Sequence, residues 1–173
     1  MILITIKISN FRVNKMDESN LKELLIEALN SEIKAKEFYI DASEKAQSQA
    51  GKEFFKELAS FEENHYNKVK KIINSLEQGE KIEKDDSSDT KHKTHSEVEG
   101  EIEPNKDEIV DVINLAIEAE KNAQKRYRLI AKMLTEPDAK SIFEDLANEE
   151  GNHQRILEHQ FYQISNKGTI IWE

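Results

Sequence analysis

The feature that most constrains this chain is an internal repeat with an offset of 88 residues, the difference between positions 54 and 142. The segment 54–69 reads FFKELASFEENHYNKV, and the segment 142–157 reads IFEDLANEEGNHQRIL. Each copy contains Glu-x-x-His, and a Glu, an Ala and a Tyr upstream of it recur at the same offset. The chain therefore resembles two copies of one helical hairpin. Each copy contributes one Glu and one Glu-x-x-His. The matching pairs are Glu62 and Glu150, His65 and His153, Glu32 and Glu120, Ala35 and Ala123, and Tyr39 and Tyr127.

Apolar residues spaced three and four apart predict four amphipathic helices. The first two should be joined by a short polar turn at 47–51, so they should pack antiparallel. Asn-x-x-Glu patterns at Asn20 and Asn105 resemble capping boxes and predict where the first and third helices begin. The second helix should end near Gly79, whereas the fourth should begin at Pro137 and end at 166–168.

Residues 80–104 are highly charged and lack a helical period, which predicts a linker between the two hairpins. If the halves are related by a pseudo-twofold axis, the second and third helices run parallel and this segment must return along the bundle. A 28-residue helix is roughly 42 Å long, and about 25 extended residues at ~3.3 Å each span more than that. We therefore expect an all-α fold, a four-helix bundle of two antiparallel hairpins with one long crossover.

The two ends of the chain differ from this pattern. Residues 1–16 begin with ILITIKI, which alternates as a strand does, and the C-terminal segment 169–172 is the one other candidate strand to pair with it. Alternatively, Met16 is the true start and the first fifteen residues are not native. We expect an N-terminal extension at 1–16, one helical domain at 17–168 and a tail at 169–173.

Composition excludes several classes of function. The net charge is −10 and the basic residues are interleaved with Glu, which argues against nucleic acid or an anionic membrane as partner. The chain has no Cys, so disulfides, thiol catalysis and cysteine-ligated metals are excluded. No apolar run reaches membrane-spanning length and the N-terminus lacks the pattern of a secretory signal, so we expect a cytoplasmic protein.

The repeated motif predicts a metal centre. Glu makes up 26 of 173 residues, so about one His in seven has a Glu three positions earlier by chance. Two copies at one offset, accompanied by a further Glu pair, are much harder to explain in that way. Four carboxylates within apolar helix faces would repel one another and resist desolvation, whereas two divalent cations would cancel their charge. An oxygen-rich set with two imidazoles suits Fe or Mn better than a closed structural zinc site.

Other polar residues are weaker candidates. Tyr39 and Tyr127 lie two turns after Glu32 and Glu120, and each is either a core aromatic residue or a hydrogen-bond donor to a ligand carboxylate. His159 lies off the ligand face and should be exposed. Any metal affinity of the linker residues His92 and His95 should be incidental, and Glu63, which aligns with Gly151, should be solvated.

The sequence resembles the rubrerythrin branch of the ferritin-like superfamily over residues 20–165. The resemblance rests on EIKAKEFY (32–39) and EKNAQKRY (120–127), together with SFEENH and NEEGNH. It implies a ferritin-like fold with two Fe ions, Mn being the alternative metal. It also implies that Glu62 and Glu150 bridge the ions, Glu32 and Glu120 are terminal ligands, and His65 and His153 each hold one ion.

Two departures from the family pattern bear on activity. Full-length rubrerythrins carry a Cys-ligated rubredoxin module, which this chain lacks. Many also have a further Glu ligand at the position of Ala123. Without that ligand, the resemblance does not imply the carboxylate-for-histidine exchange that depends on it.

The resemblance implies an oxidoreductase that reduces hydrogen peroxide in oxidative stress, with electrons from a separate donor such as rubredoxin. One alternative is a ferroxidase or iron-handling protein that oxidises Fe(II) with O₂. The other is a non-catalytic bundle that metal stabilises. We expect a homodimer, in which helices can be exchanged through the long linker, and no nucleic-acid or membrane partner.

Overall fold

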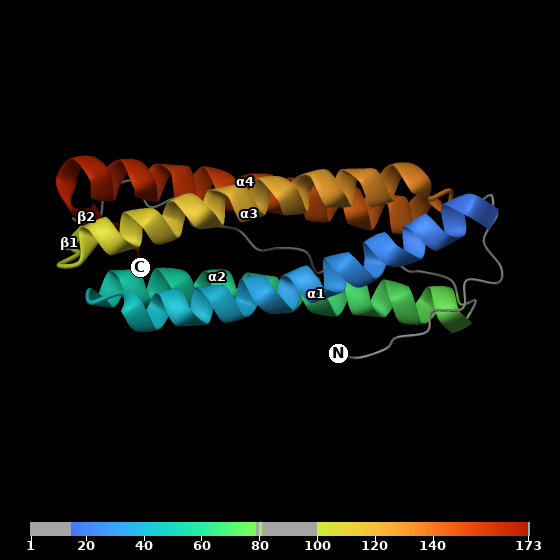
Figure 1. The fold of residues 1–173 in the computed structure, drawn as a ribbon, viewed down its shortest axis with the longest axis horizontal. Coiled ribbons are helices and arrows are strands. Elements are labelled where there is room, and N and C mark those ends of the chain that lie inside the picture. Colours follow the sequence, from blue (N-terminus) through green and yellow to red (C-terminus); the bar gives the residue numbers. More distant parts are fainter. Residues whose placement is uncertain (1–14, 79, 81–99, 173) are drawn as a thin grey trace.

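A computed structural model describes residues 15–78, 80 and 100–172 of the chain. These residues form four long helices and two very short strands (Figure 1). The elements in chain order are α1 (Lys15–Lys45), α2 (Gln49–Gln78), β1 (Glu101–Ile102), α3 (Lys106–Met133), α4 (Pro137–Lys167) and β2 (Thr169–Ile170).

The helices form the predicted bundle of two antiparallel hairpins. α1 packs along α2, and α3 packs along α4, with a smaller contact between α1 and α3. Figure 1 shows that α2 and α3 run in the same direction, so the end of α2 and the start of α3 lie at opposite ends of the bundle. The chain therefore crosses the length of the bundle between the hairpins, and the predicted fold class is confirmed.

Most predicted helix ends are confirmed, but the start of α1 and the cap of α3 differ. α4 begins at Pro137, and Gly168 ends it with a φ of 68°, a left-handed conformation that glycine adopts without strain. α1 begins at Lys15, so Asn20 lies inside it rather than at its start. Asn105 is the residue before α3 as predicted, but its side chain makes no cap hydrogen bond. Its amide nitrogen instead donates to the Lys45 carbonyl oxygen at 3.0 Å, joining α3 to the end of α1.

The C-terminal segment pairs with a partner that the sequence did not indicate. β2 lies antiparallel to β1, with Glu101 opposite Ile170 and Ile102 opposite Thr169. The expected partner, the N-terminal segment, lies outside the described residues except for its last two positions, which belong to α1. A two-residue bridge has no alternating pattern to detect, so this end of the predicted linker gave no strand signal.

The segment around β1 closes the turn between α1 and α2. Glu103 is 2% exposed, and its carboxylate accepts hydrogen bonds from the backbone N–H of Gln47 at 2.9 Å and from the Ser48 hydroxyl at 2.5 Å. Glu101 accepts from the N–H of Ala50 at 2.7 Å. The first amides of α2 therefore receive acceptors from a distant part of the chain. Gly51 permits this approach, because a Cβ there would lie 2.6 Å from a Glu103 oxygen.

The apolar core consists of two clusters, one toward each end of the bundle. The first joins the start of α1, the ends of α2 and α3 and the start of α4, and it includes Leu25, Ile72 and Phe143. The second joins the end of α1, the starts of α2 and α3 and the end of α4, and it includes Phe55, Ile113 and Leu157. Buried polar side chains occupy the middle of the bundle between these clusters.

Among the helices that the structure describes, none combines the length and the hydropathy that a membrane span requires.

Removing the Glu103 carboxylate should destabilise the fold. Glu103→Ala leaves the buried donors of Ser48 and the N–H of Gln47 without their acceptor, which costs about 1–3 kcal/mol. Urea unfolding followed by circular dichroism measures this loss. The control is Glu144→Ala on the exposed face of α4, which should change stability by less than about 0.5 kcal/mol. Equal unfolding midpoints for the two variants would contradict the capping role of Glu103.

Candidate metal centre

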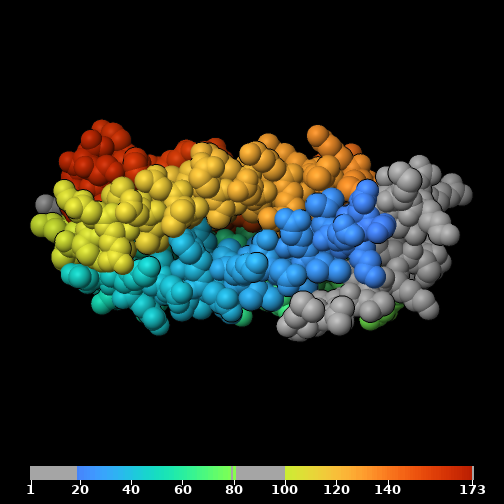
Figure 2. Space-filling view, viewed as in Figure 1, coloured from blue at the N-terminus to red at the C-terminus, as the bar shows by residue number. Residues whose placement is uncertain are grey.

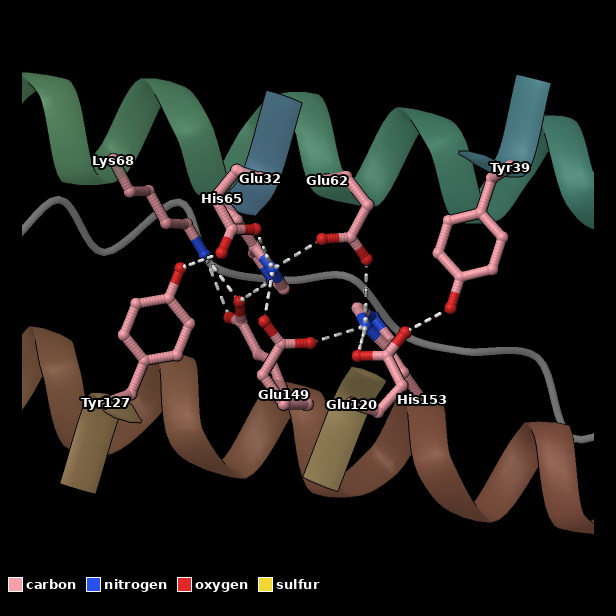
Figure 3. Close-up of polar contacts among 10 residues, drawn as sticks. Glu32, Tyr39, Glu62, His65, Lys68, Glu120, Tyr127, Glu149 and His153 are labelled. Atoms are coloured by element: carbon pink, nitrogen blue, oxygen red, sulfur yellow. Dashed lines mark hydrogen bonds and ion pairs between the residues drawn. The ribbon is translucent and has the colours of Figure 1, made fainter. Parts of the chain in front are cut away.

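The six predicted ligand side chains meet in the middle of the bundle, and Figure 3 labels all of them except Glu150. α1 and α3 each supply one glutamate, while α2 and α4 each supply a Glu-x-x-His pair. Residues three apart lie on one face of a helix, so each pair projects into the core together. All six are at most 3% exposed: Glu32, Glu62, His65, Glu120, Glu150 and His153.

The two Glu-x-x-His pairs form the centre of this arrangement. One potential ligand atom from each of these four residues can be chosen so that all four lie within 4.8 Å of one another. Nδ1 of His65 lies 3.1 Å from Oε1 of Glu150 and 3.7 Å from Oε2 of Glu62. Nδ1 of His153 lies 3.2 Å from Oε2 of Glu150 and 3.8 Å from Oε1 of Glu62. Glu62 and Glu150 therefore each turn one oxygen toward each imidazole.

Glu32 and Glu120 lie on the two outer sides of the centre. An oxygen of Glu32 is 3.6 Å from Nδ1 of His65, whereas an oxygen of Glu120 is 4.0 Å from Nδ1 of His153. The arrangement consequently has two half-sites, each with its own imidazole and outer carboxylate. The carboxylates of Glu62 and Glu150 are common to both.

The donor atoms of this centre fit a pair of metal ions. Several of them are buried and have no hydrogen-bond partner among the described residues: Oε2 of Glu32, Oε1 of Glu62, Nδ1 of His65 and Oε1 of Glu150. Buried polar atoms normally have hydrogen-bond partners. These atoms are therefore available as ligands for metal ions. Ligand atoms about 2.1 Å from one ion lie roughly 3 Å apart when they are at right angles, close to the shorter His–Glu distances given above.

Tyr39 and Tyr127 bond to ligand carboxylates of the opposite hairpin. The Tyr39 hydroxyl donates to Oε1 of Glu120, and the Tyr127 hydroxyl donates to Oε1 of Glu32 at 2.5 Å. The two rings lie on opposite sides of the polar cluster in Figure 3. Both tyrosines are also at most 1% exposed, so they serve as core aromatics and as hydrogen-bond donors at once.

Two residues beside the centre were not predicted from the sequence. Nε2 of His65 lies 2.9 Å from Oε2 of Glu149, and the Lys68 ammonium donates to both oxygens of that carboxylate at 2.8 and 2.9 Å. Glu149 therefore orients His65 with Nδ1 toward the centre, and Lys68 holds Glu149 in place.

The matching position in the other half carries a different side chain. Glu149 aligns with Phe61 at the offset of the repeat, and the Phe61 ring stacks on His153 with ring centroids 5.0 Å apart. A carboxylate thus supports one imidazole, while a phenyl ring lies against the other. A comparison of the two copies for differences, rather than for identities, would have drawn attention to this position.

Burial and mutual repulsion govern protonation in the metal-free centre. Burial raises the pKa of Glu62 and Glu120 well above the usual carboxyl value, and the nearby charge of Glu150 adds to the effect. Burial opposes protonation of His65, but the carboxylates of Glu150 and Glu149 outweigh it and raise the pKa of His65 well above 6.5. Burial lowers the pKa of His153 to about 4. Protons thus supply part of the positive charge that metal ions would otherwise bring.

The remaining candidates lie away from the centre or outside the described residues. His159 is exposed, with its ring beside the Gln163 amide. Glu63 pairs with Lys36 at 2.9 Å and is exposed to solvent. His92 and His95 lie in the segment that the structure does not describe.

Glu149→Gln should weaken one half-site more than the other. The substitution keeps the size of the side chain but removes the charge beside Nε2 of His65, and loss of such a supporting partner typically lowers metal affinity about 10–100-fold. Titration of chelated protein with Co(II) should therefore separate into a weakened step and an unchanged step. The exposed Glu63→Gln is the control and should retain the wild-type titration. Equal weakening of both steps would contradict the assignment of Glu149 to His65.

Without metal, the protein should become less stable as the pH rises from 7 to 9. In this range unfolded Glu and His have lost their protons, whereas folded Glu62, Glu120 and His65 have raised pKa values and retain protons. Because the folded state binds more protons, its stability falls with increasing pH. Melting temperatures in EDTA across this range test the prediction.

The control for this experiment is a double variant, Glu62→Gln with Glu120→Gln, which should show a flatter dependence on pH. A melting temperature that is constant or rises between pH 7 and 9 would contradict the raised pKa values.

Solved structures similar to this chain are known. A hypothetical protein from Pyrococcus furiosus has 28% sequence identity and a TM-score of 0.68, covering 91% of this chain and 98% of that one. A two-domain protein from Anabaena variabilis, with DJ-1/ThiJ/PfpI-like and ferritin-like domains, has 17% identity and a TM-score of 0.61. That match covers 86% of this chain and 38% of the larger protein, and it shows the ferritin-like fold alone.

A comparison with curated proteins finds no match. The sequence profile of the Rubrerythrin family, however, matches residues 23–161, which include all six candidate ligands. The chain therefore belongs to the rubrerythrin family.

Proposed function

We propose that this protein is a di-iron oxidoreductase that reduces hydrogen peroxide with electrons from a separate donor protein. The observation that carries the proposal is the placement of Glu62 and Glu150, which each turn one oxygen toward each of two imidazoles. Carboxylates shared in this way suit two ions close together rather than one. Membership of the rubrerythrin family supports iron as the metal.

In this proposal each ion has one imidazole and one outer carboxylate of its own. His65 and Glu32 would hold the first ion, while His153 and Glu120 would hold the second, with Glu62 and Glu150 between them. When bound, two ferrous ions would supply the two electrons that reduce peroxide, and Lewis-acid stabilisation of the charge that develops.

The surrounding residues keep the ligand carboxylates oriented. Burial raises the pKa of Tyr39 and Tyr127 well above 10, and the adjacent carboxylates raise it further. Both hydroxyls therefore keep their protons at neutral pH and remain donors to Glu120 and Glu32. The two apolar clusters exclude water from both ends of the centre, which strengthens electrostatic interactions within it.

A second candidate function is oxidation of Fe(II) by O₂, and Ala123 is the observation that favours it. Ala123 lies three residues after Glu120 on α3, where many family members have a further carboxylate. With alanine there, the six candidate ligands form a matched set of three from each hairpin. A symmetric set of this kind is typical of a ferroxidase site.

Stopped-flow mixing of diferrous protein with H₂O₂ or O₂ at matched concentrations separates the two functions. We expect oxidation of the centre to be faster with peroxide. His65→Ala and His153→Ala should each slow it at least about tenfold, because each removes a ligand from the shared centre. The exposed His159→Ala is the control and should react as wild type. A rate with O₂ equal to or above that with peroxide would favour the ferroxidase function instead.

A further inference from the structure

A pocket of about 490 Å³ lies between α1 and α3 and reaches the candidate metal centre. Its deep end is formed by the buried carboxylates of Glu32, Glu62 and Glu120. Its outer end includes the exposed residues Leu115 and Ala119. Figure 2 shows the face of the molecule along which α1 and α3 meet. The pocket thus joins the surface to the ligands of both half-sites.

The walls between these ends are mainly small or apolar. Ala35 on α1 and Ala123 on α3 contribute only methyl groups, and Phe38 lines the pocket as well. The polar groups that line the pocket, apart from the carboxylates and Tyr39, are half-buried or exposed. Ala123 matters most here, because a longer side chain at this half-buried position would fill space beside Glu120.

The size of the pocket exceeds what hydrogen peroxide requires. A water molecule occupies about 30 Å³ in the liquid, and H₂O₂ has only two non-hydrogen atoms. Pockets that bind organic ligands are typically about 300–1,000 Å³ and mostly apolar, with a few polar groups at one end. The pocket between α1 and α3 falls within that size range, with buried carboxylates at its deep end. Toward solvent its lining is alanine, Leu115 and Phe38 together with half-buried or exposed polar side chains.

We propose that the substrates include organic hydroperoxides, whose alkyl or aryl group lies on the alanine wall of this pocket. The proposal rests on the proposed peroxide-reducing function and extends its substrate class. The hydroperoxide ROOH is reduced to the alcohol ROH and water as the oxygen–oxygen bond breaks. Two protons come from solvent, and two molecules of a reduced one-electron carrier protein supply the two electrons. Bound iron would provide the redox chemistry that passes these electrons to the peroxide. The hydroperoxyl group enters toward Glu32, Glu62 and Glu120, so the organic group remains in the outer part of the pocket.

The test compares cumene hydroperoxide with H₂O₂ as substrates of the iron-loaded protein, with reduced methyl viologen as electron donor. We expect wild-type kcat/KM for cumene hydroperoxide to be within about tenfold of that for H₂O₂. Ala123→Leu should lower the ratio of the two kcat/KM values at least tenfold, because it narrows the pocket. Ala119→Leu should lower the ratio too, and as Ala119 is exposed, this variant adds nothing to the core. The control Asn114→Leu adds the same side chain at an exposed position of α3 outside the pocket lining and should leave the ratio unchanged.

A second measurement needs neither metal nor turnover. Cumyl alcohol, the product, should bind to chelated wild-type protein in saturation-transfer NMR, and both alanine variants should weaken this binding. Reduction of H₂O₂ without reduction of cumene hydroperoxide, or an unchanged ratio in both variants, would overturn the proposal. If neither peroxide is reduced, the proposed function fails and organic hydroperoxide reduction fails with it. Binding of cumyl alcohol then still decides whether the pocket accepts an organic group, and its absence would contradict the pocket assignment.

Discussion

Burial of four carboxylates and two imidazoles at one level of the bundle is the constraint on which the rest of this structure depends. Side chains of this kind resist transfer from water into an apolar interior unless opposite charge or hydrogen bonds compensate. The bundle meets this requirement by placing an apolar cluster on each side of the polar layer. Helices of 28 to 31 residues are long enough to hold all three layers, so helix length follows from the need to stabilise the centre from both ends.

Because of the tyrosine hydrogen bonds, the centre requires both hairpins. α1 and α3 run antiparallel, so the residue two turns after Glu32 comes level with Glu120, and the residue two turns after Glu120 comes level with Glu32. Each outer carboxylate is consequently oriented by the hairpin that does not carry it. A single hairpin would contain one Glu and one Glu-x-x-His. It would lack the shared carboxylate of the other hairpin, and it would also lack the tyrosine that orients its own outer carboxylate.

The sequence was most informative where the two copies of the repeat agree. Identical spacing placed Glu32, Glu62 and His65 against their counterparts, and the structure brings all six together. The partners of the tyrosines stayed open, because spacing along one helix does not indicate which residue of another helix lies beside it. Glu149 was overlooked since its counterpart is Phe61, and a search for matches passes over such a position.

Predictions from the sequence were weakest where contacts are few and long-range. β1 is too short for any periodic pattern, and its role depends on a turn more than fifty residues away in the chain. Asn105 has the sequence of a capping box, yet its side chain accepts no cap hydrogen bond. Its amide nitrogen donates to the Lys45 carbonyl oxygen at the end of α1 and to the Glu108 carboxylate in the first turn of α3. Local propensity gave the correct helix start in this case, but not the hydrogen bonds that stabilise it.

Glu101 and Glu103 impose an order on the completion of the molecule. Both lie after the crossover, yet Glu103 accepts hydrogen bonds from the turn before α2 and Glu101 accepts them from the first amides of α2. β1, which contains Glu101, pairs in turn with β2, beyond the end of α4. A chain emerging from the ribosome therefore presents its first hairpin before the cap for α2 has been synthesised, and the strand partner of β1 follows only after α4. The two copies of the repeat contribute alike to the centre, but the acceptors that cap the first hairpin are synthesised only after the crossover.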